Sequence, residues 1–355
     1  MAGAPGLWYV DMRTPVVLVQ DVLRLFKEPH RSDPAIREVV AECRRRLRRS
    51  LTALYPGKLL LTFDALLLDQ VITDLVRSAN GVAGLAAGER SLGPYMCVPY
   101  GNILSGEIVP NTVTKSLHLD KALEEDSLNY RIRPMPGYSD LEIQVRTLAA
   151  FHRPVILTDD LLHNGHRLRR LREVFTQEDL DIHEVIVGIL SGTGRDLMAQ
   201  QGCRVDAVYH IPNLLHWFNE SLLYPFIGGD SVDGAPLGEG PLQTANLILP
   251  YYYPTHLRGV GEEKIAALSL CALENAREIL SAMESRHQAC FGTPLSIRRL
   301  AEAFLVPRAP YRSSDLRYRP DSLPSSYVHD DIALFRRLRP EDGAVSGGAA
   351  VGIIP

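Results

Sequence analysis

Residues 154–167 read Pro-Val-Ile-Leu-Thr-Asp-Asp-Leu-Leu-His-Asn-Gly-His-Arg, and this stretch decides the fold that we expect. The apolar residues at its start predict a buried strand, and Gly165 predicts a turn that leads into a helix. Asp159 and Asp160 stand where a parallel strand should end, which is the edge at which open α/β sheets bind ligands. Because the backbone amides at a helix N-terminus favour an anion, we expect a site for a phosphorylated sugar here.

Composition and charge are those of an ordinary globular protein. The chain has 355 residues, 46% of them apolar and 23% charged, which suffices for one large domain or two modest ones. A formal net charge of −4 argues against nucleic acid as the main partner. The five cysteines form no Cys-x-x-Cys pair, so we expect neither a disulfide framework nor a zinc ribbon. No apolar run reaches the ~20 residues of a membrane span, and we expect a cytoplasmic protein that binds no membrane.

The hydrophobic pattern divides the chain into four expected parts. They are an N-terminal helical extension (1–55), an α/β domain (56–240), a C-terminal helical region (241–307) and an extended or disordered tail (308–355). In the first part we expect helices from Val16 to Lys27 and from Pro34 to about Leu54. The run from Arg44 to Arg49 is typical of a solvated helix face. A long helix from about Glu262 to His287 is expected to cover the sheet or to join two copies of the chain in a homodimer.

Strands and helices alternate in the second part. The expected strands are Lys58 to Phe63, Tyr95 to Pro99, Thr112 to Lys115, the strand from Pro154, Glu184 to Leu190, and Val205 to Tyr209. The expected helices are Ala65 to Ala79, 140–152, Arg167 to Phe175, and Arg195 to Gln200. This alternation predicts an α/β fold with a doubly wound, mostly parallel sheet, to which helical N- and C-terminal extensions are added.

The stretch from Val155 to Arg167 resembles the phosphoribosyl-diphosphate signature of type I phosphoribosyltransferases, in which apolar strand residues, two acids and a short glycine loop follow one another. The resemblance implies that Asp159 and Asp160 contact the ribose hydroxyls. It also implies that the loop holds the 5-phosphate through His163, Asn164, Gly165, His166 and Arg167. The loop departs from that family in one respect, because histidines flank Asn164-Gly165 where the family carries Thr or Ser. A histidine also donates hydrogen bonds, more strongly when it is protonated.

A wider resemblance extends over about half of the chain, from Pro56 to Asp230. It is to the phosphoribosyltransferase-like domain found at the C-terminus of bacterial cytidyltransferase-related proteins. The segments that carry it are Met96 to Asn102, Val109 to Lys115, Val155 to Gly165, and Trp217 to Asp230. The resemblance implies a type I phosphoribosyltransferase-like fold, whereas the biochemical role of that family is poorly defined.

Further candidate residues follow the other strands. Lys115 and Arg133 are candidates for contacting a diphosphate leaving group, Arg133 from a mobile hood over Arg131 to Tyr138. The plainer interpretation is an exposed lysine and a surface loop. Thr193 and Arg195 follow another strand and are candidates for holding an anion, although a simple tight turn explains them equally. Trp217 and Tyr224 are candidates for stacking on a flat acceptor ring, with a buried aromatic core as the alternative.

These features predict a magnesium-dependent phosphoribosyltransferase that acts on phosphoribosyl diphosphate or a related phosphorylated sugar or nucleotide, with an unknown acceptor. Asp159 and Asp160 are the expected magnesium ligands, since Mg²⁺ prefers oxygen ligands and retained waters. Two alternatives stay open. His163-Asn-Gly-His166 also resembles the histidine motif of nucleotidylyltransferases, at the wrong distance from Ser191, Thr193 and Arg195. A non-catalytic sensor of a nucleotide or sugar phosphate would explain the missing loop threonines.

Overall fold

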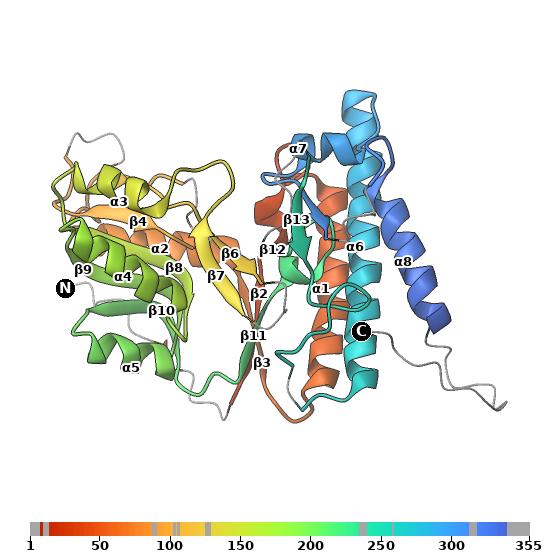
Figure 1. Cartoon of the computed structure of the whole chain (residues 1–355), viewed down its shortest axis with the longest axis horizontal. Coiled ribbons are helices and arrows are strands. Elements are labelled where there is room, and N and C mark those ends of the chain that lie inside the picture. Colours follow the sequence, from red (N-terminus) through yellow and green to blue (C-terminus); the bar gives the residue numbers. More distant parts are fainter. Residues whose placement is uncertain are drawn as a thin grey trace.

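The structure is a computed structural model. It describes residues 8–9, 14–86, 91–101, 104, 107–124, 129–233, 240–257, 259–311 and 318–338. Figure 1 shows an α/β layer at one end of the molecule, a group of helices at the other, and two smaller sheets between them. Among the described residues, no helix is both long enough and apolar enough to cross a membrane.

The largest sheet is parallel throughout. In spatial order its strands are β1 (Trp8–Tyr9), β10 (Val205–Ile211), β9 (Ile182–Ser191), β8 (Val155–Leu162), β4 (Met96–Pro99) and β5 (Val113–Thr114). Five of these strands, β4, β5, β8, β9 and β10, can be numbered 1 to 5 in chain order. Across the sheet, starting from β5, their order is then 2-1-3-4-5, and the direction of winding reverses between β4 and β8. This reversal is the topological switch point, where doubly wound folds bind their ligands.

Helices cover both faces of this sheet. On one face lies α2 (Ala65–Ala79), and on the other lie α3 (Leu141–Ala149), α4 (His166–Gln177) and α5 (Gly192–Gln200). The start of β8 shows why, because Val155 and Leu157 pack under α3 and α4 while Ile156 packs against α2. A strand that is buried on both faces needs a continuous apolar run. The prediction of an α/β fold with a doubly wound parallel sheet is therefore confirmed.

Two smaller sheets adjoin the large one. One is the parallel sheet of β11 (His216–Asn219), β2 (Val16–Gln20) and β3 (Leu60–Asp64). The other is a mixed sheet of β14 (Arg308–Pro310), β13 (Leu242–Ala245), β12 (Asp230–Val232), β6 (Leu119–Leu123) and β7 (Tyr130–Pro134). The β6–β7 hairpin brings the mixed sheet next to α4 (Figure 1).

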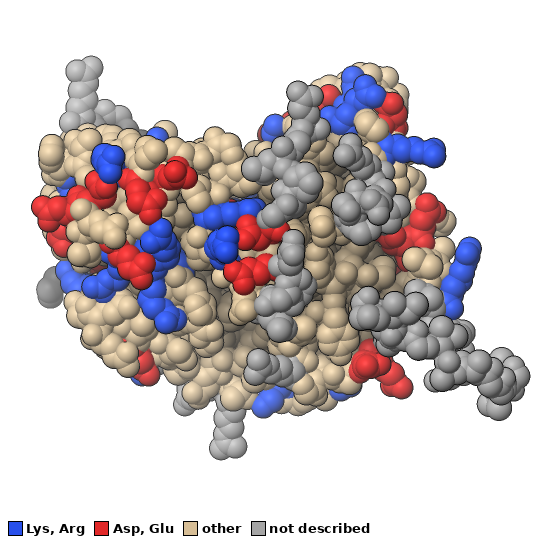
Figure 2. Space-filling view, in the orientation of Figure 1, with Lys and Arg blue, Asp and Glu red and all other residues tan. Residues whose placement is uncertain are grey.

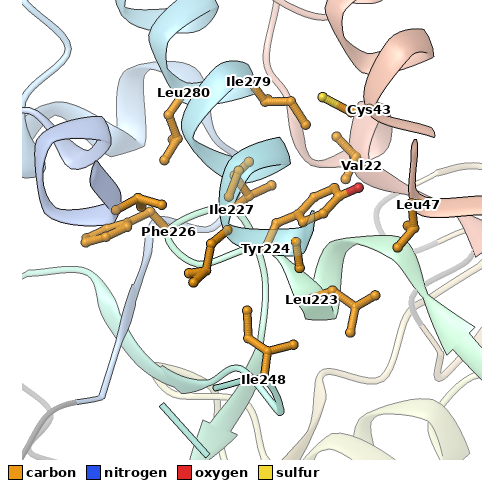
Figure 3. Packing of buried hydrophobic residues seen from close by; sticks show 14 of the residues in the cluster. Val22, Cys43, Leu47, Leu223, Tyr224, Phe226, Ile227, Ile248, Ile279 and Leu280 are labelled. Atoms are coloured by element: carbon orange, nitrogen blue, oxygen red, sulfur yellow. The ribbon is translucent and has the colours of Figure 1, made fainter. Parts of the chain in front are cut away.

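The helical end of the molecule has its own core. Its helices are α1 (Pro34–Leu54), α6 (Glu262–Phe291), α7 (Leu300–Ala303) and α8 (Pro324–Leu338), with short 3-10 turns η1 (Val22–Leu25), η2 (Glu220–Leu223) and η3 (Ile297–Arg299). α6 packs against both α1 and α8. Figure 3 shows the ring of Tyr224 among Val22, Cys43 and Leu223 in this core. The long C-terminal helix therefore buries its apolar residues within the chain.

The expected helix from Val16 to Lys27 is wrong. Val16–Gln20 is the central strand of its sheet, and only Val22–Leu25 forms a single 3-10 turn. Four consecutive apolar residues, three of them valine, open the segment, and β-branched side chains favour a buried strand. Because β2 pairs with β3, this sheet crosses the expected boundary between residues 55 and 56.

The expected tail is also partly wrong. Residues Arg308–Pro310 pair with β13, and Pro324–Leu338 forms α8, whose Val328 and Ile332 are buried against the helical core. Residues 312–317 and 339–355 of that tail lie outside the described part of the chain. The predicted second helix of the first part, α1, is confirmed at both ends.

Candidate functional site

The two acids of residues 154–167 lie at the switch point of the large sheet. β4 ends at Pro99, which pairs with Thr158, so Asp159 and Asp160 lie beyond the end of the neighbouring strand. β8 itself continues to Leu162 alongside β9, and in this respect the expectation that the acids end their strand is wrong. They nevertheless occupy the open edge where the loops after β4 and β8 diverge.

Both carboxylates are buried and face one cation. Asp159 is 4% exposed and Asp160 is 9% exposed. Arg167 Nη1, from the first turn of α4, lies 3.2 Å from Asp159 Oδ1 and 3.7 Å from Asp160 Oδ1. The backbone N–H of Asp160 also donates to Asp159 Oδ1, at 2.8 Å. Arg167, which we expected in the phosphate loop, is thus the partner of the acid pair.

The loop after β4 closes over this acid pair at Gly101. A Cβ atom on Gly101 would lie 1.9 Å from Asp159 Oδ1 and 3.0 Å from Asp160 Oδ1. Real Cβ atoms do not approach so closely, so only glycine fits at this position without a shift of the carboxylates. The preceding Tyr100 is also buried. No local pattern singles out Gly101, since β4 and β8 are more than 50 positions apart.

Burial and the neighbouring charges separate the pKa values of the two acids. Burial, with the negative charge of Asp160, raises the pKa of Asp159 well above its ordinary value. Burial also acts to raise the pKa of Asp160, but the hydrogen bond with Asp159 and the charge of Arg167 outweigh it and lower that pKa. The two acids therefore titrate as a coupled pair, in which Asp160 ionises before Asp159 and faces Arg167 as a carboxylate.

A second ion pair lies behind the first. Arg24 Nε of η1 is 2.9 Å from Asp69 Oδ2 of α2, and the N–H of Leu104 donates to Asp69 Oδ1 at 3.3 Å. Burial raises the pKa of Asp69 to about 6, and the charge of Asp160 adds to that rise. Sequence reasoning missed both residues. A signal was present, because Asp69 shares the buried face of α2 with Leu68 and Ile72.

The loop between β8 and α4 is built around Gly165. Its φ is +64°, and a Cβ there would lie 2.1 Å from Leu197 Cδ2, so the position needs glycine on both counts. Gly165 is also the N-cap of α4, which no side chain of the cap residue closes. Asn164 and His166 on either side are exposed. The first turn of α4 therefore presents backbone N–H groups to a ligand.

His163 makes a contact within the protein. Its Nδ1 lies 2.7 Å from Ser191 Oγ, and that oxygen accepts a hydrogen bond from Gly194 N at the start of α5. The ring of His163 is half-buried, with its centroid 5.5 Å from that of Trp217 on β11. His163 and Trp217, both predicted as site residues, thus lie together beside the loop.

Lys121 of β6 is a cation near the loop between β8 and α4 that sequence reasoning missed. Its Nζ lies 3.8 Å from Asp230 Oδ2 and 3.5 Å from the centre of the Tyr130 ring. Burial lowers the pKa of His166, and the charges of Arg169 and Lys121 lower it further. Figure 2 shows blue and red side chains over α4 and over the β6–β7 hairpin, on the face that contains this region. Lys121 reaches the loop only through the pairing of β6 in the mixed sheet, which no local pattern predicts.

The two cations expected at a leaving group are Arg133, which carboxylates engage, and Lys115, which is exposed. Arg133 Nε lies 3.2 Å from Asp120 Oδ2, and its Nη1 lies 2.9 Å from Asp233 Oδ1. Residues Arg131 to Pro134 of the expected hood lie in strand β7 of a paired hairpin, so this part is not a surface loop. Lys115 is exposed, and its charge lowers the pKa of His118, after the larger effect of burial.

The remaining predicted residues divide between surface and core. Thr193 and Arg195 are exposed at the start of α5, and Arg195 pairs with the adjacent Asp196 at 3.2 Å. Tyr224 is wholly buried in the helical core, where Asn275 Nδ2 donates to its hydroxyl at 3.1 Å. Tyr224 is therefore a core residue, and its assignment to a substrate pocket is wrong.

A shallow hollow of about 550 Å³ lies away from this site, on the exposed face of α1. It is lined by Arg45, Arg48, Arg49, Thr52 and Ala53. Arg45 pairs with Glu42 on the same helix, so this part of the run is the solvated face that we expected. The expectation is wrong for Arg44, which is largely buried and pairs with Glu220.

Comparison with known proteins adds little. The sequence matches no protein-family model and has no significant match among curated proteins. The AQ2163 protein from Aquifex aeolicus is 16% identical, and the structural alignment, with a TM-score of 0.26, covers 52% of this chain and 85% of that one. TT1426 from Thermus thermophilus is 17% identical, with a TM-score of 0.23, and the alignment covers 41% of this chain and 83% of that one. Similarities at these TM-scores assign no chemistry to the site.

Proposed function

We propose that this chain binds a phosphorylated pentose or nucleotide at the carboxyl ends of β4 and β8 and transfers a phosphoribosyl group from phosphoribosyl diphosphate to an acceptor. The observation that carries the proposal is the position of the Asp159–Asp160 pair at the switch point of a 2-1-3-4-5 sheet. The pair is directly followed by a glycine loop and an uncapped helix N-terminus. A sugar and its phosphate need these two kinds of group side by side.

The charges of the site suit the two ends of such a ligand. The ionised carboxylate of the acid pair would accept hydrogen bonds from ribose hydroxyls and stabilise positive charge that grows on the ring as diphosphate leaves. The backbone N–H groups at the start of α4 would hold the 5-phosphate. Lys121 is close enough to His166 to lower its pKa and would add positive charge at that end. No step is assigned to Arg133, because two carboxylates already engage it.

An acceptor ring would stack beside the loop. Trp217 is half-buried at the end of the parallel sheet β11-β2-β3, next to His163. A partly exposed aromatic side chain can stack on a flat ring without selecting a particular base. We therefore assign the acceptor to the class of planar bases or ring amines.

Release of pyrophosphate from phosphoribosyl diphosphate tests the proposal. The purified chain is incubated with phosphoribosyl diphosphate and a panel of bases and amines, and pyrophosphate is measured. Asp160→Asn should lower the turnover by about 10²–10³-fold, as loss of an electrostatic group in an active site does. The matched control is Asp196→Asn, since Asp196 is exposed and pairs only locally with Arg195. Undiminished turnover in Asp160→Asn would refute the mechanism.

A non-catalytic sensor is the second candidate, and one observation favours it. Arg133 is held by Asp120 and Asp233, while Lys115 projects from the surface, so neither expected cation is placed for a leaving group. Tight binding of phosphoribosyl diphosphate without pyrophosphate release would support the sensor. Incorporation of label from a nucleoside triphosphate would instead support the nucleotidylyltransferase alternative.

A further inference from the structure

The sequence analysis predicts magnesium at Asp159 and Asp160, so the contacts of these two side chains bear on whether Mg²⁺ binds here. Among the residues that the structure describes, no group of three or more His, Cys, Asp or Glu side chains is arranged to hold a metal. Mg²⁺ also binds through one or two carboxylates together with substrate phosphates, so the geometry of the acid pair itself decides the matter.

One oxygen of each acid, the Oδ1 atom, already faces Arg167. Asp159 Oδ1 accepts from the N–H of Asp160 at 2.8 Å and from Arg167 Nη1 at 3.2 Å. The Oδ1 atom of Asp160 also faces Arg167 Nη1, at 3.7 Å. Gly101 covers the same two oxygens so closely that a single Cβ atom would collide with them. An octahedral ion that keeps its waters would therefore have to displace Arg167 to bind these two oxygens.

The positive charge of Arg167 also disfavours a divalent ion at the acid pair. The guanidinium of Arg167 always carries its positive charge, and it lies where a cation shared by the two carboxylates would lie. Behind the pair, Arg24 neutralises Asp69, so that acid adds no uncompensated charge. A divalent ion at the pair would therefore meet the repulsion of the partly buried Arg167 guanidinium within a few ångströms.

We infer that Arg167 occupies the place of a divalent cation at the Asp159–Asp160 pair, so that this site binds a sugar phosphate without a metal. The sugar phosphate in this statement rests on the proposed function, whereas the part about metal concerns only the side chains of the chain.

A Mn²⁺ titration of the full-length chain, followed by electron paramagnetic resonance, tests the metal part without any substrate. We expect the wild-type chain and Arg170→Gln to leave the signal of aqueous Mn²⁺ unchanged at millimolar metal. Arg170 is the control because it lies on the same helix and pairs with Glu142 and Glu173 away from the acids. Arg167→Gln removes the resident cation and should raise the affinity for Mn²⁺ at least about tenfold. Binding by the wild-type chain that Asp160→Asn abolishes would overturn the inference.

Two further measurements keep the test decisive if Arg167→Gln folds poorly. Arg167→Lys keeps a cation at the pair and should bind no Mn²⁺, and binding by that variant would also overturn the inference. Calorimetry of the wild-type chain with ribose 5-phosphate should give the same Kd in EDTA as in Mg²⁺. A Kd at least about tenfold weaker in EDTA would overturn the inference. Absence of binding in both buffers would count against the proposed function, while the Mn²⁺ result would still decide the role of Arg167.

Discussion

Gly101 packs its backbone directly against the carboxylates of Asp159 and Asp160. An alanine there would place its Cβ 1.9 Å from Asp159 Oδ1, so the β4 loop or the carboxylates must move. We expect Gly101→Ala to lower the free energy of unfolding by about 1–3 kcal/mol, the usual effect of overpacking, and to weaken binding of ribose 5-phosphate. Urea unfolding and calorimetry measure the two effects. Gly84→Ala is the matched control, since a Cβ on Gly84 meets nothing within 4 Å. Equal stability of the two variants would contradict this prediction.

Asp69 gives the stability of the chain a pH dependence of known sign. Burial raises its pKa from 3.8 to about 6 in the folded chain, so the folded state binds the proton more tightly than the unfolded state does. The associated stability is present below about pH 4 and is lost as the pH rises to about 6. A shift of this size corresponds to about 3 kcal/mol.

The substitution Asp69→Asn removes this titration. We expect the variant to gain stability relative to the wild-type chain as the pH rises from about 4 to about 7. Urea unfolding at a series of pH values measures the difference, with Asp74→Asn as the control, because Asp74 lies on the same helix and its side chain is 67% exposed. A constant difference between Asp69→Asn and wild type across this range would show that Asp69 does not titrate as described.

At the scale of elements, the N-cap of α1 is the clearest case in which local sequence determined local structure. Asp33 Oδ1 accepts from Ala35 N at 3.0 Å and from Ile36 N at 3.1 Å, and Pro34 occupies the first turn. We expect Asp33→Ala to lower the free energy of unfolding by about 1–2 kcal/mol. Asp140→Ala is the control, because Asp140 is the N-cap of α3 but its side chain makes no capping hydrogen bond. Similar losses in the two variants would mean that the cap of α1 contributes nothing specific.

Elements whose state depends on distant partners were harder to predict. Val16–Gln20 has an apolar run that fits a buried strand or a buried helix, and pairing with β3 and β11 decides between them. In the expected tail, Val328, Ile332 and Phe335 follow helical spacing and are buried, a signal that the proline- and serine-rich segment before them obscured.

At the scale of the whole molecule, the residues of the candidate site fall into those that are close in the sequence and those that only the fold brings together. Asp159, Asp160, Gly165 and Arg167 lie within nine positions of each other, and their grouping followed from the sequence alone. The other parts come from elsewhere in the chain, namely Arg24, Asp69, Gly101 and Lys121. Only the folded topology brings these residues to the loop, which is why residue spacing did not predict them.

Arg44 connects helix α1 to η2 and to the sheet of β11, β2 and β3 by charge. Arg44 Nε of α1 lies 3.0 Å from Glu220 Oε2 of η2, and Arg44 Nη1 lies 3.6 Å from Asp64 Oδ2 at the end of β3. The side chain of Glu220 is wholly buried, and burial raises its pKa from 4.5 to about 7 in spite of Arg44. Stability linked to this group is therefore present below about pH 4.5 and is lost as the pH rises to about 7.

Removal of Arg44 should increase the total loss of stability that ionisation of Glu220 causes as the pH rises. In Arg44→Gln the buried carboxylate has no cation, which costs about 3–5 kcal/mol when the carboxylate is ionised. At pH 5 Glu220 holds its proton, so the variant should lose much less than it does at pH 8. Urea unfolding at the two pH values tests this, with Arg48→Gln, on the exposed face of the same helix, as the control. Equal losses at pH 5 and pH 8 would show that Arg44 acts through its packing and does not stabilise the contact of α1 with η2 by charge.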